Sequence, residues 1–181
     1  MSIKKIVVIG PESTGKSTLS KSLAKTLGTV WVKEFARAYL ETLNREYTEE
    51  DLLRIAEGQL KEEERLLELA NNFLICDTDL HVIKVWSEHK YQRCHRHILE
   101  QIAEKRYDLY LLTYIDVPWE SDPLREHPGE GQRKYFYEQY KDIVANAGVD
   151  WIEIKGSEEE RLTTALKKIG QLQNDAVTHS S

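Results

Sequence analysis

The chain has 181 residues, of which 40% are hydrophobic and 31% charged, and its formal net charge is −6. This composition fits one globular domain with room for a five-stranded core, and the acidic balance excludes a surface that coats nucleic acid. No apolar stretch approaches the roughly 20 residues of a membrane span, and Cys76 and Cys94 form no C-x-x-C pattern, so a reducing, cytoplasmic location is expected.

The first predicted elements are a strand and a helix joined by a glycine-bounded loop. Residues 6–9 read IVVI, an apolar β-branched run that predicts a buried parallel strand over 3–9. Leucines then recur every four residues, which predicts a helix over 16–27. Between them, GPESTGKS at 10–17 has the spacing G-x-x-x-x-G-K-S of a phosphate-binding loop. A plain surface turn is the alternative, but the strand before and the helix after favour nucleoside-triphosphate binding.

The loop has the chemistry that a polyphosphate needs. Backbone N–H groups at a helix start lack intrahelical partners, and the helix dipole favours negative charge there. Lys16 would supply charge to the outer phosphates, and Ser17 a hydroxyl for Mg²⁺. The predicted nucleotide-binding residues of the loop are Gly10, Glu12, Ser13, Thr14, Gly15, Lys16, Ser17 and Thr18.

The rest of the chain alternates between strand and helix patterns. The further predicted strands are 29–34, 73–77, 108–116 and 149–155, and the further helices are 35–44, 48–71, 79–104, 131–147 and 157 to about 172. This alternation predicts an α/β fold: a three-layer sandwich of the P-loop NTPase type, with a five-stranded parallel sheet, helices on both faces and a helical lid.

Local signals refine the helices and the domain limits. Thr48 with Asp51, and Ser157 with Glu160, have the spacing of capping boxes. The charged run KEEER at 61–65 is interpreted as a solvated helix face. We expect one domain over 1–173 and a frayed tail over 174–181.

Acidic residues follow the second and third strands, at the edge where doubly wound sheets bind ligands. Glu34 ends the second strand, and Arg37 follows it. Asp77 and Asp79 end the third strand and, in an extended chain, would point to the same face. Asp77 could hold Mg²⁺ opposite Ser17 or orient an attacking hydroxyl, and the alternative for either aspartate is a cap for the next helix. Whether Asp77 or Glu34 is the general base stays open.

After the fourth strand, residues 118–134 are rich in proline and glycine and contain Arg125 and Arg133. Arginine suits the charge on a transferring phosphoryl group, so we interpret this segment as a lid, with a solvated surface loop as the alternative. Trp119 could stack on a planar base there. Beyond the fifth strand, Lys155 could border an adenine.

Four motifs in this order resemble a known family. They are GPESTGKST after the first strand, EFARAY at 34–39, CDTD at 76–79, and PW-x-x-D-x-x-R at 118–125. Over about residues 3–170 the chain resembles the ribosylnicotinamide kinase domain of the NadR family. The resemblance implies an ATP-dependent kinase that converts nicotinamide riboside to the mononucleotide with Mg²⁺.

The resemblance also implies roles by position. Lys16 and Ser17 would serve phosphate and metal, Asp77 the metal or the substrate hydroxyl, and Arg125 and Arg133 the closing lid. The residues that would lie at the acceptor are Glu34, Arg37, Asp79, Trp119 and Asp122.

Only nine residues precede Gly10, which leaves no room for the adenylyltransferase or DNA-binding domains of the full-length family members. We therefore expect that the chain neither makes NAD itself nor binds operator DNA. The alternatives are a kinase for another nucleoside or small metabolite, or a nucleotide-binding ATPase switch. The guanine motif Asn-Lys-x-Asp of GTPase switches does not occur in the sequence. Oligomeric state is not encoded in any motif that we recognise.

Overall fold

The computed structural model describes residues 2–122, 124 and 129–178, with side chains described as far as Leu172. The strands are β1 (Lys4–Ile9), β2 (Trp31–Val32), β3 (Phe73–Asp77), β4 (Leu109–Thr113) and β5 (Asp150–Ile154). The helices are α1 (Lys16–Leu27), α2 (Phe35–Glu41), α3 (Glu49–Leu67), α4 (Leu80–Tyr91), α5 (Arg96–Glu104), α6 (Glu130–Asn146) and α7 (Glu158–Thr178).

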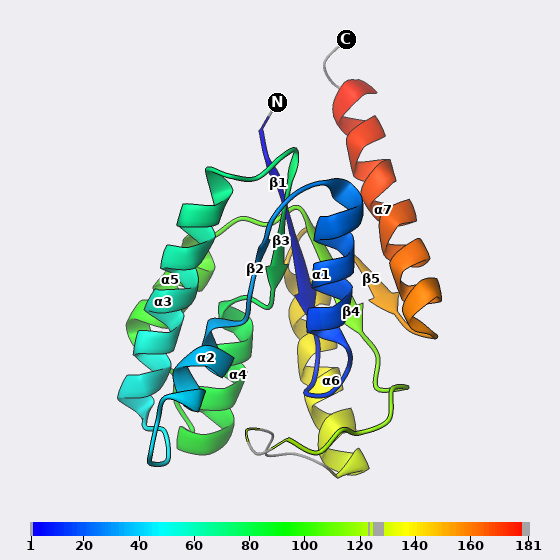
Figure 1. Ribbon diagram of the computed structural model, residues 1–181. Coiled ribbons are helices and arrows are strands. Elements are labelled where there is room, and N and C mark those ends of the chain that lie inside the picture. The colour runs from blue at the N-terminus through cyan, green and yellow to red at the C-terminus, as the bar shows by residue number, and fades with distance from the viewer. Residues whose placement is uncertain (1, 123, 125–128, 179–181) are drawn as a thin grey trace.

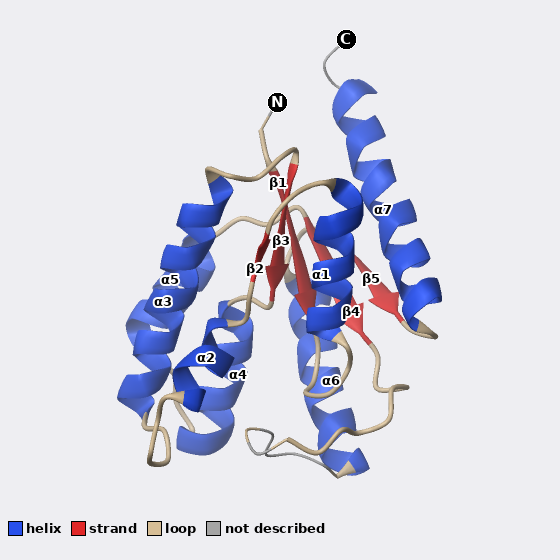
Figure 2. Ribbon diagram, in the orientation of Figure 1, coloured by secondary structure: helices blue, strands red, loops and turns tan. Residues whose placement is uncertain are grey.

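The five strands form one parallel sheet in the order β2-β3-β1-β4-β5 (Figure 2). Helices α1 and α7 pack on one face, while α4 and α6 pack on the other (Figure 1). Helices α2, α3 and α5 form a further cluster with α4 beside the β2 edge. The predicted three-layer parallel α/β fold is therefore confirmed. None of the helices in the described part of the chain is long and apolar enough to span a bilayer.

Strand β1 shows why the sheet is buried on both sides. Successive side chains of a strand point to opposite faces. Ile6 and Val8 accordingly join the cluster under α1 and α7, whereas Val7 and Ile9 join the cluster under α4 and α6. All four side chains are fully buried, so an unbroken apolar run was needed at this position.

Two predicted elements differ from the structure. Strand β2 is only two residues long, because it lies at the edge of the sheet and pairs with β3 alone. The predicted helix 79–104 is two helices, α4 and α5, separated at Gln92. That residue has the left-handed φ of 59° and donates its N–H to the Glu88 carbonyl, and the His95 ring then caps α5 by accepting from the His97 N–H.

The capping predictions are confirmed at both sites. Thr48 and Asp51 exchange hydrogen bonds at the start of α3, and Ser157 and Glu160 do the same at the start of α7. Helix α7 continues to Thr178, beyond the predicted end near 172, and fraying of the tail stays a prediction.

The interpretation of 61–65 as a solvated face is wrong at one position. Glu63 is buried, where it accepts hydrogen bonds from the Lys5 ammonium and the Tyr107 hydroxyl. A carboxylate can be buried when such partners replace its water, and neither partner is near it in sequence.

Candidate active site

The phosphate-loop sequence lies where the strand order reverses. Strand β1 is flanked by β3 and β4, so the loop after β1 and the segments after β3 and β4 meet at the carboxyl edge of the sheet (Figure 1). In open parallel sheets this reversal leaves a crevice that binds ligands. The predicted site therefore lies where the fold provides space for it.

The loop is held close against the end of β4. Position 10 requires glycine for a steric reason, because a Cβ there would lie 2.3 Å from Oγ1 of Thr113. The Thr14 hydroxyl lies 2.7 Å from the Thr113 hydroxyl and donates to the Pro11 carbonyl. Gly15, with φ of 78°, makes the left-handed turn into α1. The Lys16 ammonium donates to the Pro11 carbonyl across the loop, 2.7 Å away.

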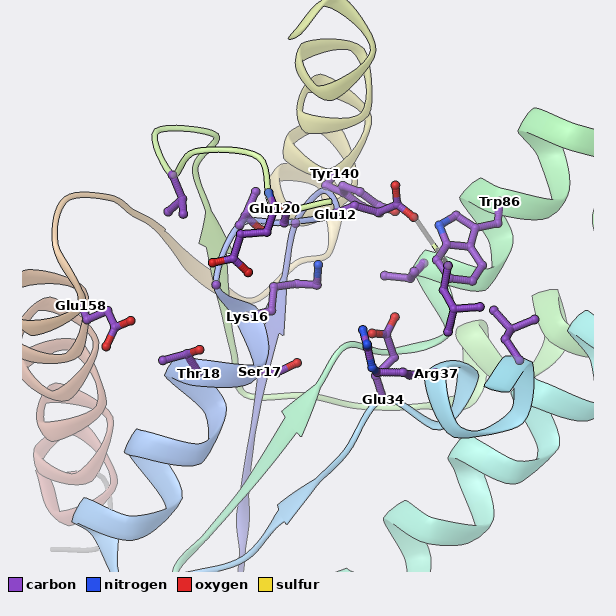
Figure 3. Close-up of a pocket in the computed structure, with 18 residues that line it drawn as sticks. Glu12, Lys16, Ser17, Thr18, Glu34, Arg37, Trp86, Glu120, Tyr140 and Glu158 are labelled. Atoms are coloured by element: carbon purple, nitrogen blue, oxygen red, sulfur yellow. The ribbon is translucent and has the colours of Figure 1, made fainter. Parts of the chain in front are cut away.

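A cavity of about 210 Å³ opens over this loop. Figure 3 shows Lys16 and Ser17 on one side of it, facing Glu34 and Arg37 on the other. Trp86 from α4 closes the far wall (Figure 3). The lining residues from outside the loop are Glu34, Arg37, Leu40, Val82, Trp86, Val117, Glu120, Leu124, Tyr140 and Glu158.

Glu34 is the titratable group of the cavity that is best suited to accept a proton. Burial, together with the nearby carboxylates of Asp77 and Glu12, raises its pKa to about 7 against the opposing effect of the Lys16 ammonium. The residue precedes α2 as its N-cap without a side-chain capping bond, so the carboxyl is not needed to hold the helix. A carboxylate with this pKa can act as a general base near neutral pH.

Asp77 and Ser17 form an oxygen site that fits Mg²⁺. Asp77 is buried at the end of β3, and desolvation raises its pKa, while the Ser17 hydroxyl and the Lys16 ammonium act in the opposite direction. Among the residues that the structure describes, Oδ1 of Asp77 is buried without a hydrogen-bond partner. A buried oxygen without a partner destabilises the folded protein by its lost hydration, and a hard divalent cation is a suitable partner for it. Ser17 and Asp77 are thus the residues that would hold Mg²⁺.

Asp79 does not share this environment, although only Thr78 separates the two aspartates. Thr78 has φ of 71°, so the chain is not extended there and the carboxylates diverge. Oδ1 of Asp79 accepts from the His81 N–H and caps α4, and Oδ2 lies 2.8 Å from the Tyr110 hydroxyl. Of the two interpretations that the sequence left open, the structure shows the cap, and Asp79 does not line the cavity, so its role at the acceptor stays a prediction.

The segment after β4 reaches across the cavity to α2. The Arg37 guanidinium donates to Oδ2 of Asp122 over 2.7 Å, and Oδ1 of Asp122 accepts from the Leu124 N–H. Two predicted acceptor residues thus bind each other at the rim. Arg125 lies outside the described residues. In the described part of 118–129 there is no helix, so the helical portion of the predicted lid is the first turn of α6.

Arg133 and Trp119 lie in a different environment from the one predicted. The Arg133 guanidinium is buried and donates to the carbonyls of Ser13 and Val117, so it joins the phosphate loop to the β4–α6 connection. Trp119 is half-buried, and its ring lies 5.9 Å from that guanidinium. Arg133 therefore contacts the loop and is not a solvated surface arginine, and its role as a lid residue stays a prediction.

Two residues that line the cavity were missed, and the predicted residues Trp119 and Lys155 do not line it. Trp86 and Tyr140 line the cavity as its aromatic wall, in place of Trp119 (Figure 3). Trp86 follows Val82 by one helical turn on the helix after β3, a spacing that could have predicted a shared face. The Lys155 ammonium pairs with Glu153 at 2.6 Å, while its neighbour Gly156 lines a second cavity, so an adenine contact of Lys155 stays a prediction.

That second cavity has a volume of about 260 Å³ and lies on the other side of the loop. It is lined by Gly15, Thr18, Leu19, Ser22, Asp116, Val117, Pro118, Gly156, Ser157, Glu158 and Arg161. Because Gly15, Thr18 and Glu158 line both cavities, one ligand could extend from the first cavity into the second.

Comparisons with known proteins agree with this geometry. A family model described as an AAA domain matches residues 5–161. The trifunctional NAD biosynthesis/regulator protein NadR of Salmonella typhimurium is 26% identical over 159 residues, and that of Escherichia coli is 25% identical over the same length. Each alignment covers 84% of this chain but 38% of the relative, so the chain spans less than half the length of these curated relatives.

Among solved structures, the chain is similar to NadR and to a nucleoside kinase. A crystal structure of NadR protein in complex with NR has a TM-score of 0.66 and 26% identity over 84% of this chain and 43% of that chain. A complex of NadR with NAD and AMP-PNP has a TM-score of 0.65 and 25% identity over 86% and 44%. A deoxyadenosine kinase from M. mycoides, at 16% identity and a TM-score of 0.59, covers 93% of this chain and 99% of its own and shares the fold.

Proposed function

This chain belongs to the AAA domain family and, on that premise, we propose that it is an ATP-dependent kinase that phosphorylates nicotinamide riboside on its 5′-hydroxyl. The observation that carries the proposal is the pairing of a phosphate loop with a carboxylate of pKa about 7 across one cavity. The likeness to NadR, which has been crystallised with NR and with AMP-PNP, supports this choice of donor and acceptor. The free cysteines agree with a cytoplasmic location.

The phosphate loop would bind the triphosphate of ATP. The backbone N–H groups at the start of α1 would face the phosphates, and Lys16 would exchange its bond to the Pro11 carbonyl for the outer phosphates. When bound between Ser17 and Asp77, Mg²⁺ would supply charge neutralisation at the phosphates. The second cavity, which shares Gly15 and Thr18 with the first, would take the nucleobase.

Glu34 would then activate the acceptor. The 5′-hydroxyl oxygen forms a bond to the γ-phosphorus, the bond from that phosphorus to the bridging oxygen breaks, and ADP leaves with the electron pair. The hydroxyl proton passes to the Glu34 carboxylate. Raised by burial to about 7, the pKa of this carboxyl lets it accept a proton at neutral pH. In this scheme Asp77 is the poorer base, because with Ser17 it would hold Mg²⁺.

Trp86 is the residue that we expect to contact the ring of the acceptor. Nicotinamide riboside carries a positive charge on its pyridinium ring, and the face of an indole attracts such a cation. Trp86 lines the cavity together with Val82 and Tyr140, and Figure 3 shows it across the cavity from Lys16.

Replacing Trp86 by alanine is therefore expected to raise the KM for nicotinamide riboside by roughly tenfold and to leave the KM for ATP within about twofold. Steady-state kinetics with each substrate varied in turn measures both. Trp86→Phe is the matched control: it keeps an aromatic face and should stay within about threefold of wild type. Equal loss of affinity for both substrates would contradict a specific ring contact.

The proposed activity is tested by ATP consumption with and without nicotinamide riboside. We expect strong stimulation by the riboside, and a phosphorylated product in equal amount to ADP. Uridine, cytidine and deoxyadenosine serve as competing acceptors. A stronger response to one of these nucleosides would reassign the acceptor, whereas hydrolysis that ignores every acceptor would favour an ATPase switch.

A further inference from the structure

Arg161, in the first turn of α7, is a buried cation without a role in the steps above. Its side chain is 4% exposed, and its guanidinium binds four oxygens. Three are backbone carbonyls: Nη1 donates to Thr14 over 2.7 Å, Nε to Gly156 over 2.9 Å, and Nη2 to Tyr114 over 3.3 Å. The fourth is the Asp116 carboxylate, which forms an ion pair with Nη2. These oxygens come from the phosphate loop, the end of β4 and the β5–α7 turn.

The bond to Thr14 bears directly on phosphate binding. A trans peptide unit is planar, so its C=O and the N–H of the next residue point in opposite directions. When Arg161 holds the Thr14 carbonyl on its own side, the Gly15 N–H is turned away from it. Gly15 has φ of 78° and no side chain, so its own conformational preferences do little to fix that peptide. The guanidinium supplies this restraint, and it lies 3.7 Å from where a Gly15 Cβ would be.

The same guanidinium also holds the turn on the other side of the second cavity. The Gly156 carbonyl accepts from Nε of Arg161, and the Gly156 N–H donates to Oδ2 of Asp116 over 2.7 Å. Gly156 is thus held from both sides by one arginine–aspartate pair. Gly15, Asp116, Gly156 and Arg161 all line the second cavity.

We propose that Arg161 is a positioning residue that couples the phosphate loop to the β5–α7 turn, so that nucleotide binding depends on both being held by one guanidinium. The inference rests on the proposed binding of ATP at the loop. A planar fork with five donors can satisfy carbonyls in three directions, whereas the point charge of lysine on a flexible stem cannot.

The test is Arg161→Lys, with binding measured by calorimetry for two probes in the presence of Mg²⁺. In the proposed binding mode ATP would contact the loop and the turn, whereas inorganic tripolyphosphate would contact the loop alone. We expect the Kd of both probes to rise by about tenfold or more, because the lost bonds are charge-assisted. Arg54→Lys, at an exposed arginine on α3, is the matched control and should change neither Kd.

Asp116→Asn separates the contact with the Gly156 turn from the contact with the phosphate loop. It becomes the deciding variant if the Arg161→Lys protein does not fold. It weakens the hold on Gly156 while the bond from Arg161 to Thr14 is kept, so the Kd for ATP should rise several-fold and that for tripolyphosphate should stay within about twofold.

A merely structural role would lower the Tm of folded Arg161→Lys and leave both dissociation constants within twofold of wild type, which would overturn the inference. Unchanged ATP binding by folded Asp116→Asn would overturn it as well. Failure of the wild-type protein to bind ATP would instead refute the proposed function, so the two failures are distinguishable.

Discussion

Replacing Glu34 by glutamine is expected to lower kcat by about 10²–10⁴, the usual contribution of a general base. Glutamine keeps the size and a carbonyl oxygen but cannot take the proton of the acceptor hydroxyl. ATP binding should stay within about threefold of wild type, because Glu34 lies across the cavity from the phosphate loop (Figure 3). Single-turnover kinetics and calorimetry with ATP measure the two effects separately.

The pH dependence gives a second readout of the same group. Burial and neighbouring carboxylates raise the pKa of Glu34 to about 7, and only the deprotonated form can act as a base. The kcat/KM for the acceptor should therefore fall as pH decreases through about 7, and Glu34→Gln should lose this limb.

Glu41→Gln is the matched control for this prediction. Glu41 belongs to the same helix, is exposed and pairs with Arg37. The Glu41→Gln variant should have the same kcat and the same pH profile as the wild-type protein. If Glu34→Gln retained more than a third of wild-type turnover, the base would have to be sought elsewhere in the cavity.

The second large effect is expected at Asp77. Replacement by asparagine removes the charge of a buried oxygen site, and we expect at least a tenfold weaker apparent affinity for Mg²⁺ and a kcat lower by roughly 10² at saturating metal. Binding of ATP without metal, measured in EDTA, should be unchanged or tighter, since a carboxylate next to the phosphates is removed. Rate measurements over a Mg²⁺ titration at fixed ATP give the first two values.

Asp79→Asn provides a control two residues along the chain. Asparagine keeps the cap of α4 but removes the charge that the His81 ring and the Tyr110 hydroxyl contact, so the free energy of unfolding should fall by about 1 kcal/mol and the Mg²⁺ dependence should not change. A Mg²⁺ response altered equally by both variants would mean that the metal site is not at Ser17 and Asp77.

Much of the site was predictable from the sequence because its determinants are local. The phosphate loop is a contiguous string between an apolar strand and an amphipathic helix, and Glu34 and Asp77 each follow an apolar strand. Parallel strands that alternate with helices bring their carboxyl ends to one edge, so the facing positions of Ser17, Glu34 and Asp77 follow from chain order. The capping boxes at Thr48 and Ser157 are local in the same sense.

Only the tertiary structure decided the roles of the side chains whose partners are remote in sequence. Arg133 was interpreted as a lid residue, yet it binds the Ser13 carbonyl 120 positions away, and Arg161 binds Thr14 across 147 positions. A buried guanidinium donates to whichever backbone carbonyls lie around it in the folded chain, and the spacing of residues in the sequence does not predict which carbonyls these are. Asp79 caps α4 for a backbone reason, because the left-handed turn at Thr78 sends two neighbouring carboxylates to different places. The sequence by itself thus determined the sheet, the loop and the edge where they meet, whereas long-range hydrogen bonding decided which polar residues face the cavity and which hold it in shape.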